Sequence, residues 1–336
     1  MSKILLSICI PVYNFGTFIS ETLESIIKQA TNEVEIVVVD GASTDNTTDI
    51  VRGFQARYAG LRYYRLEKKG GIDYDMAKSV ELARGKYCWL FGGDDIMLPN
   101  ALPKMLRQIS EGHDVCLCES ILCRFDMTPI AKHTMFKLKE EQVFDLSREE
   151  EREEYFRNAL NTAAFFSFCS ALVFNKSRWD AIKPDDQFMG SCWAHAARLL
   201  RMMPDGLKVK YLPEPYLYKR CDNDSFLDKG LVNRFRIAID GYNRIAEFIF
   251  GRESIEGFHI RRALRNEHKV RNLLRAKLIC HEEGLHHDMK ILESLASMLY
   301  IDPILLNRIN FLAFKLTPIW VLKCIRPIYI YIQKYI

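Results

Sequence analysis

The sequence predicts an α/β protein in which a mostly parallel sheet is flanked by helices and followed by a helical C-terminal region. Three observations support this fold class. Strands and helices alternate over residues 5–95, the strands there are continuous apolar runs, and the patterns beyond about residue 228 are all helical. A chain of 336 residues is long enough for one large domain and a smaller one.

The first strand and helix open the chain. Residues 4–14, ILLSICIPVYN, form a β-prone run of the kind that is buried on both faces of a sheet. Apolar residues at three- and four-residue steps then indicate a helix: Phe15, Phe18, Ile19, Leu23, Ile26 and Ile27. Residues 33–40, EVEIVVVD, predict a second buried strand, and the turn after it opens a second helix. This order predicts parallel strands.

Two more strands continue the alternation. They are LRYYRLEK (61–68) and KYCWLFGG (86–93), separated by a helix over IDYDMAKSVELARG (72–85). In open α/β sheets, ligands bind beyond the carboxyl ends of the strands. Asp40, Asp94 and Asp95 all follow strands, so we expect a ligand to meet them there.

The middle of the chain has a looser pattern. It predicts a helix (101–109), a strand pair (113–125), a charged helix (146–160), an apolar strand or buried helix (163–182), and a short strand and turn (206–220). Pro213 and Pro215 punctuate the last of these. We expect a boundary between residues 216 and 228, with a catalytic domain over 1–220 and a helical region over 221–336.

Composition sets limits on the class of protein. A net charge of +4 is mild, and the ten cysteines are scattered without zinc-site spacing, so we expect free thiols in a reducing cytoplasm. No apolar run reaches the length of about 20 residues that spans a bilayer. The basic run over 259–277 lacks a nucleic-acid reading motif, so no nucleic acid is expected as a partner.

Asp94 and Asp95 are adjacent carboxylates that repel each other unless a positive charge lies beside them. A divalent cation, Mn²⁺ or Mg²⁺, would relieve this repulsion, because such hard ions are held by one or two carboxylates together with substrate phosphates. The alternative is a surface turn in which both residues cap the next helix.

Three segments resemble the family 2 glycosyltransferases of the GT-A fold: SICIPVYN, VVVDGASTDNT and GKYCWLFGGDD, within residues 5–100. The resemblance implies a Rossmann-like sheet. It also implies that the donor nucleotide contacts Pro11, Tyr13, Asp40 and Asp73, and that Asp94 and Asp95 hold ribose and metal in that order. Asp73 has helix capping as its alternative role. Both carboxylates of the pair are candidate metal ligands, and Asp95 is a candidate catalytic residue.

A narrower resemblance extends to about residue 235. YCWLFGGDD, SRWDAI and CDNDSFLDKG are similar to segments of the abequosyltransferases of bacterial O-antigen assembly. The resemblance implies a CDP-abequose donor or a close relative, a polyprenyl-diphosphate-linked oligosaccharide acceptor, and a peripheral position at the cytoplasmic face of a bacterial membrane.

The sequence offers more than one candidate for the general base. Many family 2 members use an aspartate from a Glu-Asp pair, and the matching segment here, QFMGSCWAHAARLLRM, has none. His195 stands at about that place, and its ordinary pKa near 6.5 suits a base at neutral pH. Asp185 and Asp186 are substitutes. Without the usual pair, inverting and retaining outcomes both stay open.

The segment YKRCDNDSF (218–226) combines Arg220, Asn223 and Ser225. We expect a flexible loop that closes over the donor diphosphate; the alternative is a polar linker between domains. The final segment, residues 311–336, mixes aromatic, aliphatic and basic residues in a way that suits a membrane interface. The alternative there is a helix packed on the catalytic domain or on a second subunit of a homo-oligomer.

Other functions are weaker fits. A transferase for another nucleotide sugar is the nearest alternative. A nucleotidyltransferase would carry a glycine-rich basic loop near the first strand, and IPVYNFGTF has no lysine or arginine. A non-catalytic sugar-nucleotide-binding protein would need Asp40 but neither Asp94 nor Asp95.

Overall fold

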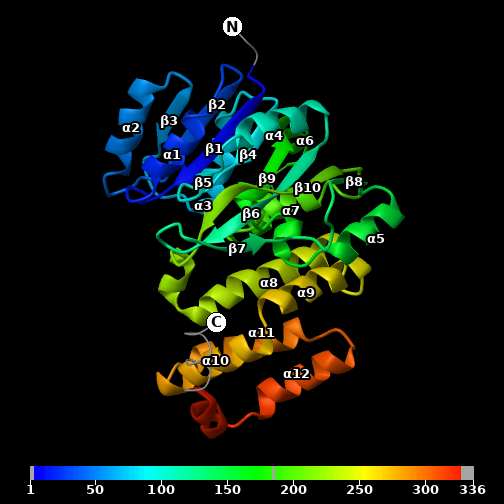
Figure 1. Ribbon diagram of the computed structural model, residues 1–336. Coiled ribbons are helices and arrows are strands. Elements are labelled where there is room, and N and C mark those ends of the chain that lie inside the picture. Colours follow the sequence, from blue (N-terminus) through cyan, green and yellow to red (C-terminus); the bar gives the residue numbers. More distant parts are fainter. Residues whose placement is uncertain (1–3, 184–185, 327–336) are drawn as a thin grey trace. The chain divides into compact units, whose positions relative to one another are not determined.

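The computed structural model describes residues 4–183 and 186–326 of the chain (Figure 1). The chain divides into two compact units, residues 1–223 and 224–336. The first unit holds the sheet and the second is helical. Each unit is described by itself.

The first unit is built on one mixed sheet with the strand order β3-β2-β1-β4-β9-β6-β10-β5, to which β7 adds at β6 and β8 at β10. The strands are β1 (Leu6–Val12), β2 (Val34–Asp40), β3 (Leu61–Arg65), β4 (Tyr87–Leu90), β5 (Ile96–Met97), β6 (Val115–Cys123), β7 (Pro129–His133), β8 (Gln142–Asp145), β9 (Leu172–Asn175) and β10 (Lys208–Arg220). The first four run parallel, as the sequence predicts. Antiparallel β9 then separates them from the parallel pair β6 and β10.

Helices flank this sheet (Figure 1): α1 (Ile19–Ile27), α2 (Thr47–Arg57), α3 (Ile72–Leu82), α4 (Ala101–Ser110), α5 (Glu149–Asn158), α6 (Lys176–Ala181) and α7 (Ala194–Leu200). All residues of β1 and β2 are buried, which explains their continuous apolar sequence. The predicted alternation of strands and helices over residues 5–95 is confirmed.

Two predictions for the middle of the chain are wrong. Residues 113–125 contain the single long strand β6 and not a strand pair. Residues 206–220 contain the 13-residue strand β10 and not a short strand and turn. The two prolines of β10 are accommodated by register shifts against β6 between Leu212 and Leu217, because a proline cannot donate to the sheet.

A buried polar cluster ties the amino ends of the strands together. The Ser7 hydroxyl donates to Glu35 at 2.7 Å, and the backbone N–H groups of Arg84 and Gly85 donate to Glu35 and Ser7 at 2.6 and 2.8 Å. Arg62 pairs with the same glutamate at 3.1 Å. The cluster gives a buried carboxylate several donors, as burial of a charge requires.

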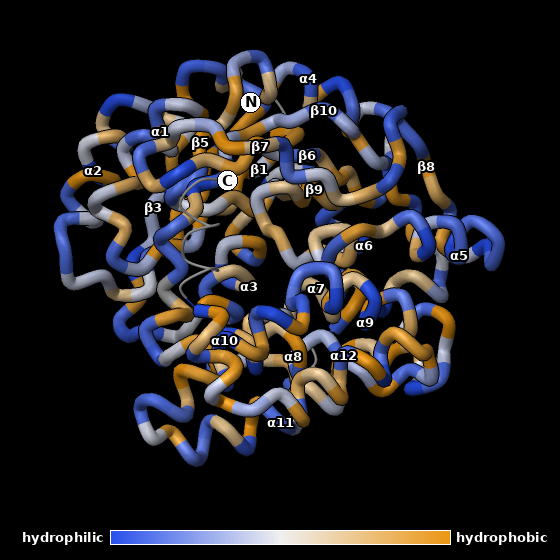
Figure 2. Tube along the Cα trace, turned by 60° about the horizontal axis from the view of Figure 1, so that its bottom comes forward, coloured by the Kyte–Doolittle hydropathy of each residue, from blue (hydrophilic) through white to orange (hydrophobic). Residues whose placement is uncertain are grey.

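The second unit contains α8 (Leu231–Phe250), α9 (Ile255–Glu267), α10 (Val270–Glu282), α11 (His286–Leu299) and α12 (Leu305–Leu316), after a 3-10 turn over Ser225–Lys229. Its helical character is as predicted. Asp302 is buried between Arg261 and Arg265, at 2.7 and 2.6 Å. Hydrophobic and hydrophilic segments alternate along these helices (Figure 2). Within the described part of the chain, every helix is too short or too polar to cross a bilayer.

Gly85 offers a test of the strand-end cluster. A Cβ at this position would lie 2.7 Å from both the amide nitrogen and the hydroxyl of Ser7, whereas a Cβ at Gly53 in α2 would meet nothing within 4 Å. We expect Gly85→Ala to lower the free energy of unfolding by about 1–3 kcal/mol, the usual cost of overpacking. Gly53→Ala is the matched control, expected to raise it by about 0.5–1 kcal/mol because alanine favours a helix. Urea denaturation of both variants measures the difference, and similar effects would contradict this role for Gly85.

Candidate functional site

The predicted ligand edge is formed by the carboxyl ends of the first parallel strands. Asp40 is the last residue of β2, and Asp94 and Asp95 lie between β4 and β5. β10 reaches the same turn from the far side of the sheet, because its last residue, Arg220, bonds to both Asp94 and Asp95. Strands distant in sequence thus meet around the carboxyl pair.

Asp95 is 4% exposed and its carboxyl group is held from two sides. One oxygen accepts from the Ser170 hydroxyl at 2.5 Å and the other from the backbone N–H of Arg220 at 3.1 Å. Burial, with the neighbouring charge of Asp94 as a second cause, raises the pKa of Asp95 to about 7. Removing water therefore disfavours its charged form more than these two donors favour it.

Asp94 is half-buried and accepts from the Asn223 side-chain amide at 2.5 Å. Burial raises its pKa, although the Asn223 hydrogen bond and the charges of Arg220 and Lys219 oppose that shift. The two neighbouring carboxyl groups are thus short of positive charge in the protein alone. This electrostatic environment suits a cation brought by a ligand.

The residues present fit a metal that is shared with a ligand. Across the described residues, no group of three or more His, Cys, Asp or Glu side chains is arranged to hold a metal by itself. Two carboxylates with few other protein ligands are typical of Mg²⁺ or Mn²⁺ bound through substrate phosphates.

Arg220 differs from its predicted position. It ends strand β10, is 7% exposed, and so does not lie in a flexible loop. Its guanidinium donates to the backbone oxygens of Asp94 and Phe125 and pairs with Glu21 at 2.5 Å. The rings of Phe18 and Phe125 lie 5.0 and 5.9 Å from it. Arg220 is therefore a fixed positive charge beneath the carboxyl pair. Whether it contacts the donor stays a prediction.

The other two residues of that predicted loop separate. Asn223 lies in the first unit, on Asp94, whereas Ser225 begins a 3-10 turn in the second unit. The structure therefore joins Asn223 to the carboxyl pair, and the role of Ser225 stays a prediction.

Asp40 is fully buried, and its oxygens accept from the Ser43 N–H at 2.7 Å and the Tyr63 hydroxyl at 2.6 Å. Pro11 is buried within β1 beside it. Tyr13 follows β1 and carries the Lys69 ammonium 3.6 Å from its ring centre. These residues form one corner of the ligand edge.

Asp75, on α3, is a residue of this corner that sequence reasoning missed. It is 3% exposed, and its Oδ1 atom has no hydrogen-bond partner among the described residues. Burial, followed by the charge of Asp40, raises its pKa to about 6. Gly41 makes room for it, since a Cβ there would lie 2.5 Å from Asp75 Oδ2. The sequence does contain one signal for Asp75: it lies in the first turn of a helix that follows a strand, where ligands of such sheets bind.

Asp73 caps a helix, although not its own. Its two carboxylate oxygens accept from the backbone N–H groups of Cys192 at 2.8 Å and Ala194 at 3.2 Å, at the start of α7. The capping alternative therefore describes its contacts in the structure, and a nucleotide contact stays a prediction.

His195 is the second residue of α7 and is 3% exposed. Its Nε2 lies 2.9 Å from the carbonyl oxygen of Phe166, and because a carbonyl only accepts, Nε2 carries the proton. Its Nδ1 is buried without a hydrogen-bond partner among the described residues. Burial lowers the pKa of His195, with the Asp73 charge opposing the shift. The ring is thus a neutral imidazole with a free lone pair on Nδ1.

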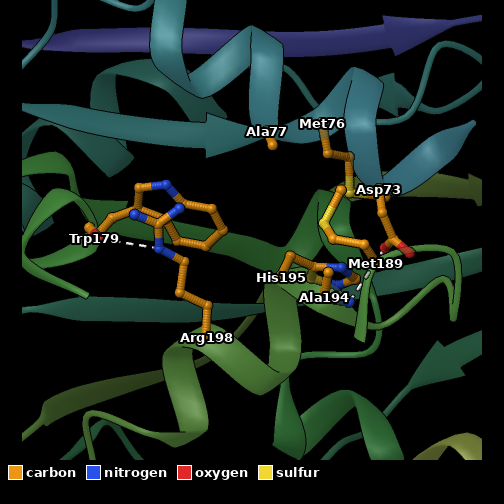
Figure 3. A pocket seen from close by; sticks show the side chains of 8 residues that line it. All are labelled: Asp73, Met76, Ala77, Trp179, Met189, Ala194, His195 and Arg198. Atoms are coloured by element: carbon orange, nitrogen blue, oxygen red, sulfur yellow. Dashed lines mark hydrogen bonds between the residues drawn. The ribbon is translucent and has the colours of Figure 1, made fainter. Parts of the chain in front are cut away.

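A pocket lies beside this ring (Figure 3). Asp73, Met76 and Ala77 of α3 line one side, and Ala194, His195 and Arg198 of α7 line another. Met189 lies at the end near Asp73 and His195, and Trp179 lies at the end near Arg198. Arg198 lies over the Trp179 ring at 4.4 Å. His195 is linked to the carboxyl pair through adjacent residues, because its Nε2 is 3.5 Å from the sulfur of Cys169 and Ser170 bonds Asp95.

Of the two substitutes for His195, only Asp186 is described, and it does not join this arrangement. Asp186 lies exposed in a 3-10 turn over Asp186–Phe188, and Asp185 is outside the described residues.

Comparison of the sequence with known proteins identifies relatives of this chain. Residues 7–179 match the family described as glycosyl transferase family 2. Abequosyltransferase RfbV of Salmonella typhimurium (strain LT2) is 30% identical over 253 residues, which are 74% of this chain and 76% of that protein. Glycosyltransferase GlyG of Streptococcus pneumoniae is 33% identical over 107 residues, only 36% of its length.

Solved structures share the fold at lower identity. S. aureus TarS 1-349 in complex with UDP-GlcNAc gives a TM-score of 0.61 at 18% identity, covering 92% of this chain and 89% of that one. The mannosyltransferase PcManGT from Pyrobaculum calidifontis, in complex with GDP-Man and Mn²⁺, gives 0.52 at 14% identity, covering 90% and 77%. The predicted α/β fold with a C-terminal helical region is confirmed.

The titration of Asp75 can be tested. Its folded pKa of about 6 lies above its ordinary value, so the folded state binds the proton more tightly, and stability is lost as pH rises from about 4 through about 6. We expect Asp75→Asn to gain stability relative to the unsubstituted protein over this range, by up to about 3 kcal/mol, since each pKa unit is worth about 1.4 kcal/mol. Urea denaturation at several pH values measures this difference. Asp126→Asn, at an exposed turn, should show no such rise, and a flat difference for Asp75→Asn would contradict the assignment.

Proposed function

This chain belongs to glycosyl transferase family 2, and we propose that it transfers a 3,6-dideoxyhexose, abequose or a close relative, from a CDP carrier. The match over residues 7–179 confirms the family that the sequence motifs resemble, and membership of this family indicates transferase activity. The observation that carries the catalytic proposal is the adjacent pair of half-buried Asp94 and buried Asp95 at the carboxyl edge of the sheet. The donor sugar rests on the similarity to abequosyltransferase RfbV.

In this proposal, different residues at the carboxyl edge of the sheet bind different parts of the donor. Pro11, Tyr13 and Asp40, with Asp73 as a further contact, bind the nucleotide base, and Asp94 binds the ribose. Asp95, together with Asp94, would hold Mn²⁺ or Mg²⁺, which supplies positive charge to the departing diphosphate. The raised pKa values of both carboxyl groups support this assignment, because a cation lowers the cost of ionising them.

His195 is proposed as the general base. Its Nδ1 carries the free lone pair, since the Phe166 carbonyl holds the proton on Nε2. A lowered pKa keeps the ring neutral at pH 7 and therefore able to accept a proton from an acceptor hydroxyl. Arg220 and Asn223 hold the carboxyl pair in place. We propose in addition that Arg220, Asn223 and Ser225 contact the diphosphate of the donor.

The proposed acceptor is an oligosaccharide linked to polyprenyl diphosphate, met at the cytoplasmic face of a bacterial membrane. Residues 1–220 would carry the reaction, and residues 221–336 would bring the enzyme to the membrane surface. These statements rest on the similarity to the abequosyltransferase and on the basic and apolar sequence of the second unit. The aromatic residues Tyr329 and Tyr331 of the predicted tail lie outside the described residues.

A donor panel tests the function. Purified protein is incubated with CDP-, UDP-, GDP- and dTDP-sugars, with Mn²⁺ and a saccharide acceptor, and nucleotide release is followed. We expect release of CDP from CDP-abequose, and loss of that release when EDTA removes the cation. Release from another nucleotide sugar would replace the donor but keep the enzyme class. Binding without release from any donor would favour a sugar-nucleotide-binding protein.

The role of His195 makes a separate prediction. We expect His195→Ala to reduce turnover at least about 100-fold, the lower range for loss of a general base, while CDP binding persists. The matched control is His113→Ala, a half-buried histidine beside Glu111 at the start of β6, expected to keep full turnover. In the unsubstituted enzyme, kcat/KM should fall on the acid side with a pKa below 6.5, since burial lowers that of His195. Turnover that is unchanged in His195→Ala would remove the base assignment.

A further inference from the structure

Helix α12 exposes an apolar face. Leu305, Ile309, Leu312 and Leu316 are each between 50% and 73% exposed. At about 100° per residue, the four side chains fall within an arc of about 60° along three turns of the helix. Asn307 and Phe314, the buried residues of α12, lie on the opposite side. A surface helix usually turns its apolar side toward the protein core. Helix α12 instead exposes four aliphatic side chains to solvent.

The helix is firmly held in this orientation. Lys277 of α10 donates to the backbone oxygens of Phe314, Lys315 and Thr317, at 2.8, 3.2 and 3.0 Å. These bonds satisfy carbonyl groups that the end of a helix leaves free. The exposed face is thus a fixed feature of the second unit and not the result of a frayed helix.

The charges beside this face have one sign. The twelve residues of α12 include two basic residues, Arg308 and Lys315, and no acidic one. Both are exposed and flank the apolar arc on the same side. Trp320, in the next helical segment, is 69% exposed. Exposed aliphatic residues with flanking basic side chains and a tryptophan are the features of a helix that lies in a lipid interface.

We propose that the outward face of α12, formed by Leu305, Ile309, Leu312 and Leu316, lies in the interface of an anionic lipid bilayer. An anionic surface provides the negative charge that Arg308 and Lys315 require, and the acyl chains cover the four aliphatic side chains. A second copy of the chain docked through the same face would bring further basic residues of α12 and no acidic one. The proposal therefore commits to lipid as the occupant. It deepens the proposed membrane role of residues 221–336 and rests on that proposal, but it does not depend on the donor or the acceptor.

Vesicle sedimentation tests the proposal with the full-length protein. Phosphatidylcholine vesicles with and without phosphatidylglycerol are used, and neither donor nor acceptor is needed. We expect binding to the anionic vesicles that weakens as salt screens the basic residues. Ile309→Glu should reduce the partition coefficient at least about tenfold, because the charge enters the apolar face. Ile255→Glu is the matched control, since Ile255 is a helix residue of the same unit and is 49% exposed, compared with 52% for Ile309. It should bind as the unsubstituted protein does.

Two further variants identify the occupant. Ile330→Glu changes the tail beyond the described residues, and Trp320→Phe removes the one strongly exposed tryptophan of the described chain. Support for the proposal would be a vesicle-induced blue shift of fluorescence that Trp320→Phe removes. The proposal is overturned if Ile330→Glu abolishes binding while Ile309→Glu leaves it intact, because the tail is then the anchor. It is equally overturned if Ile309→Glu converts a dimer to a monomer in sedimentation velocity and vesicles do not bind.

Discussion

The first unit is organised around one electrostatic constraint: two carboxyl groups stand side by side where little water reaches them. Asp95 is almost fully buried and Asp94 is half-buried, and burial raises both pKa values. The protein offers partial compensation only. Ser170, Asn223 and the backbone N–H of Arg220 donate hydrogen bonds, and the Arg220 guanidinium lies beneath the turn. The remaining deficit of positive charge is what gives the site its chemical character, because it favours a ligand that brings its own cation.

The mixed topology of the sheet brings distant strands to the turn that contains Asp94 and Asp95. The parallel strands β1, β2 and β4 direct their carboxyl ends to one edge, and antiparallel β9 joins them to β6 and β10. β10 then delivers Arg220 to the acidic turn from a position 125 residues further along the chain. The arginine is itself fixed by Glu21, Phe18 and Phe125. A strand end thus places a buried cation where a loop would have left it in water.

Local patterns in the sequence were sufficient to predict the strands and helices of residues 5–95 and the acids that follow two of these strands. The strands β1 to β4 follow from β-prone runs, and the positions of Asp40, Asp94 and Asp95 follow from acids after two of these runs, because both signals lie within a few neighbouring residues. The features that the sequence did not predict depend on contacts between distant parts of the chain. β10 looked like a strand and turn because its prolines are tolerated only through register shifts against β6. The sequence did not single out Asp75, because its close approach to Gly41 and the effect of the Asp40 charge on its pKa both come from the end of strand β2.

Asp73 has a consequence for how the enzyme would move. It belongs to α3, yet it accepts two backbone N–H groups at the start of α7, the helix that carries His195. The first turn of α3, which also carries Asp75, and the first turn of α7, which carries His195, are therefore joined by these two hydrogen bonds. A displacement of α3 would therefore also displace the start of α7, and with it the ring of His195.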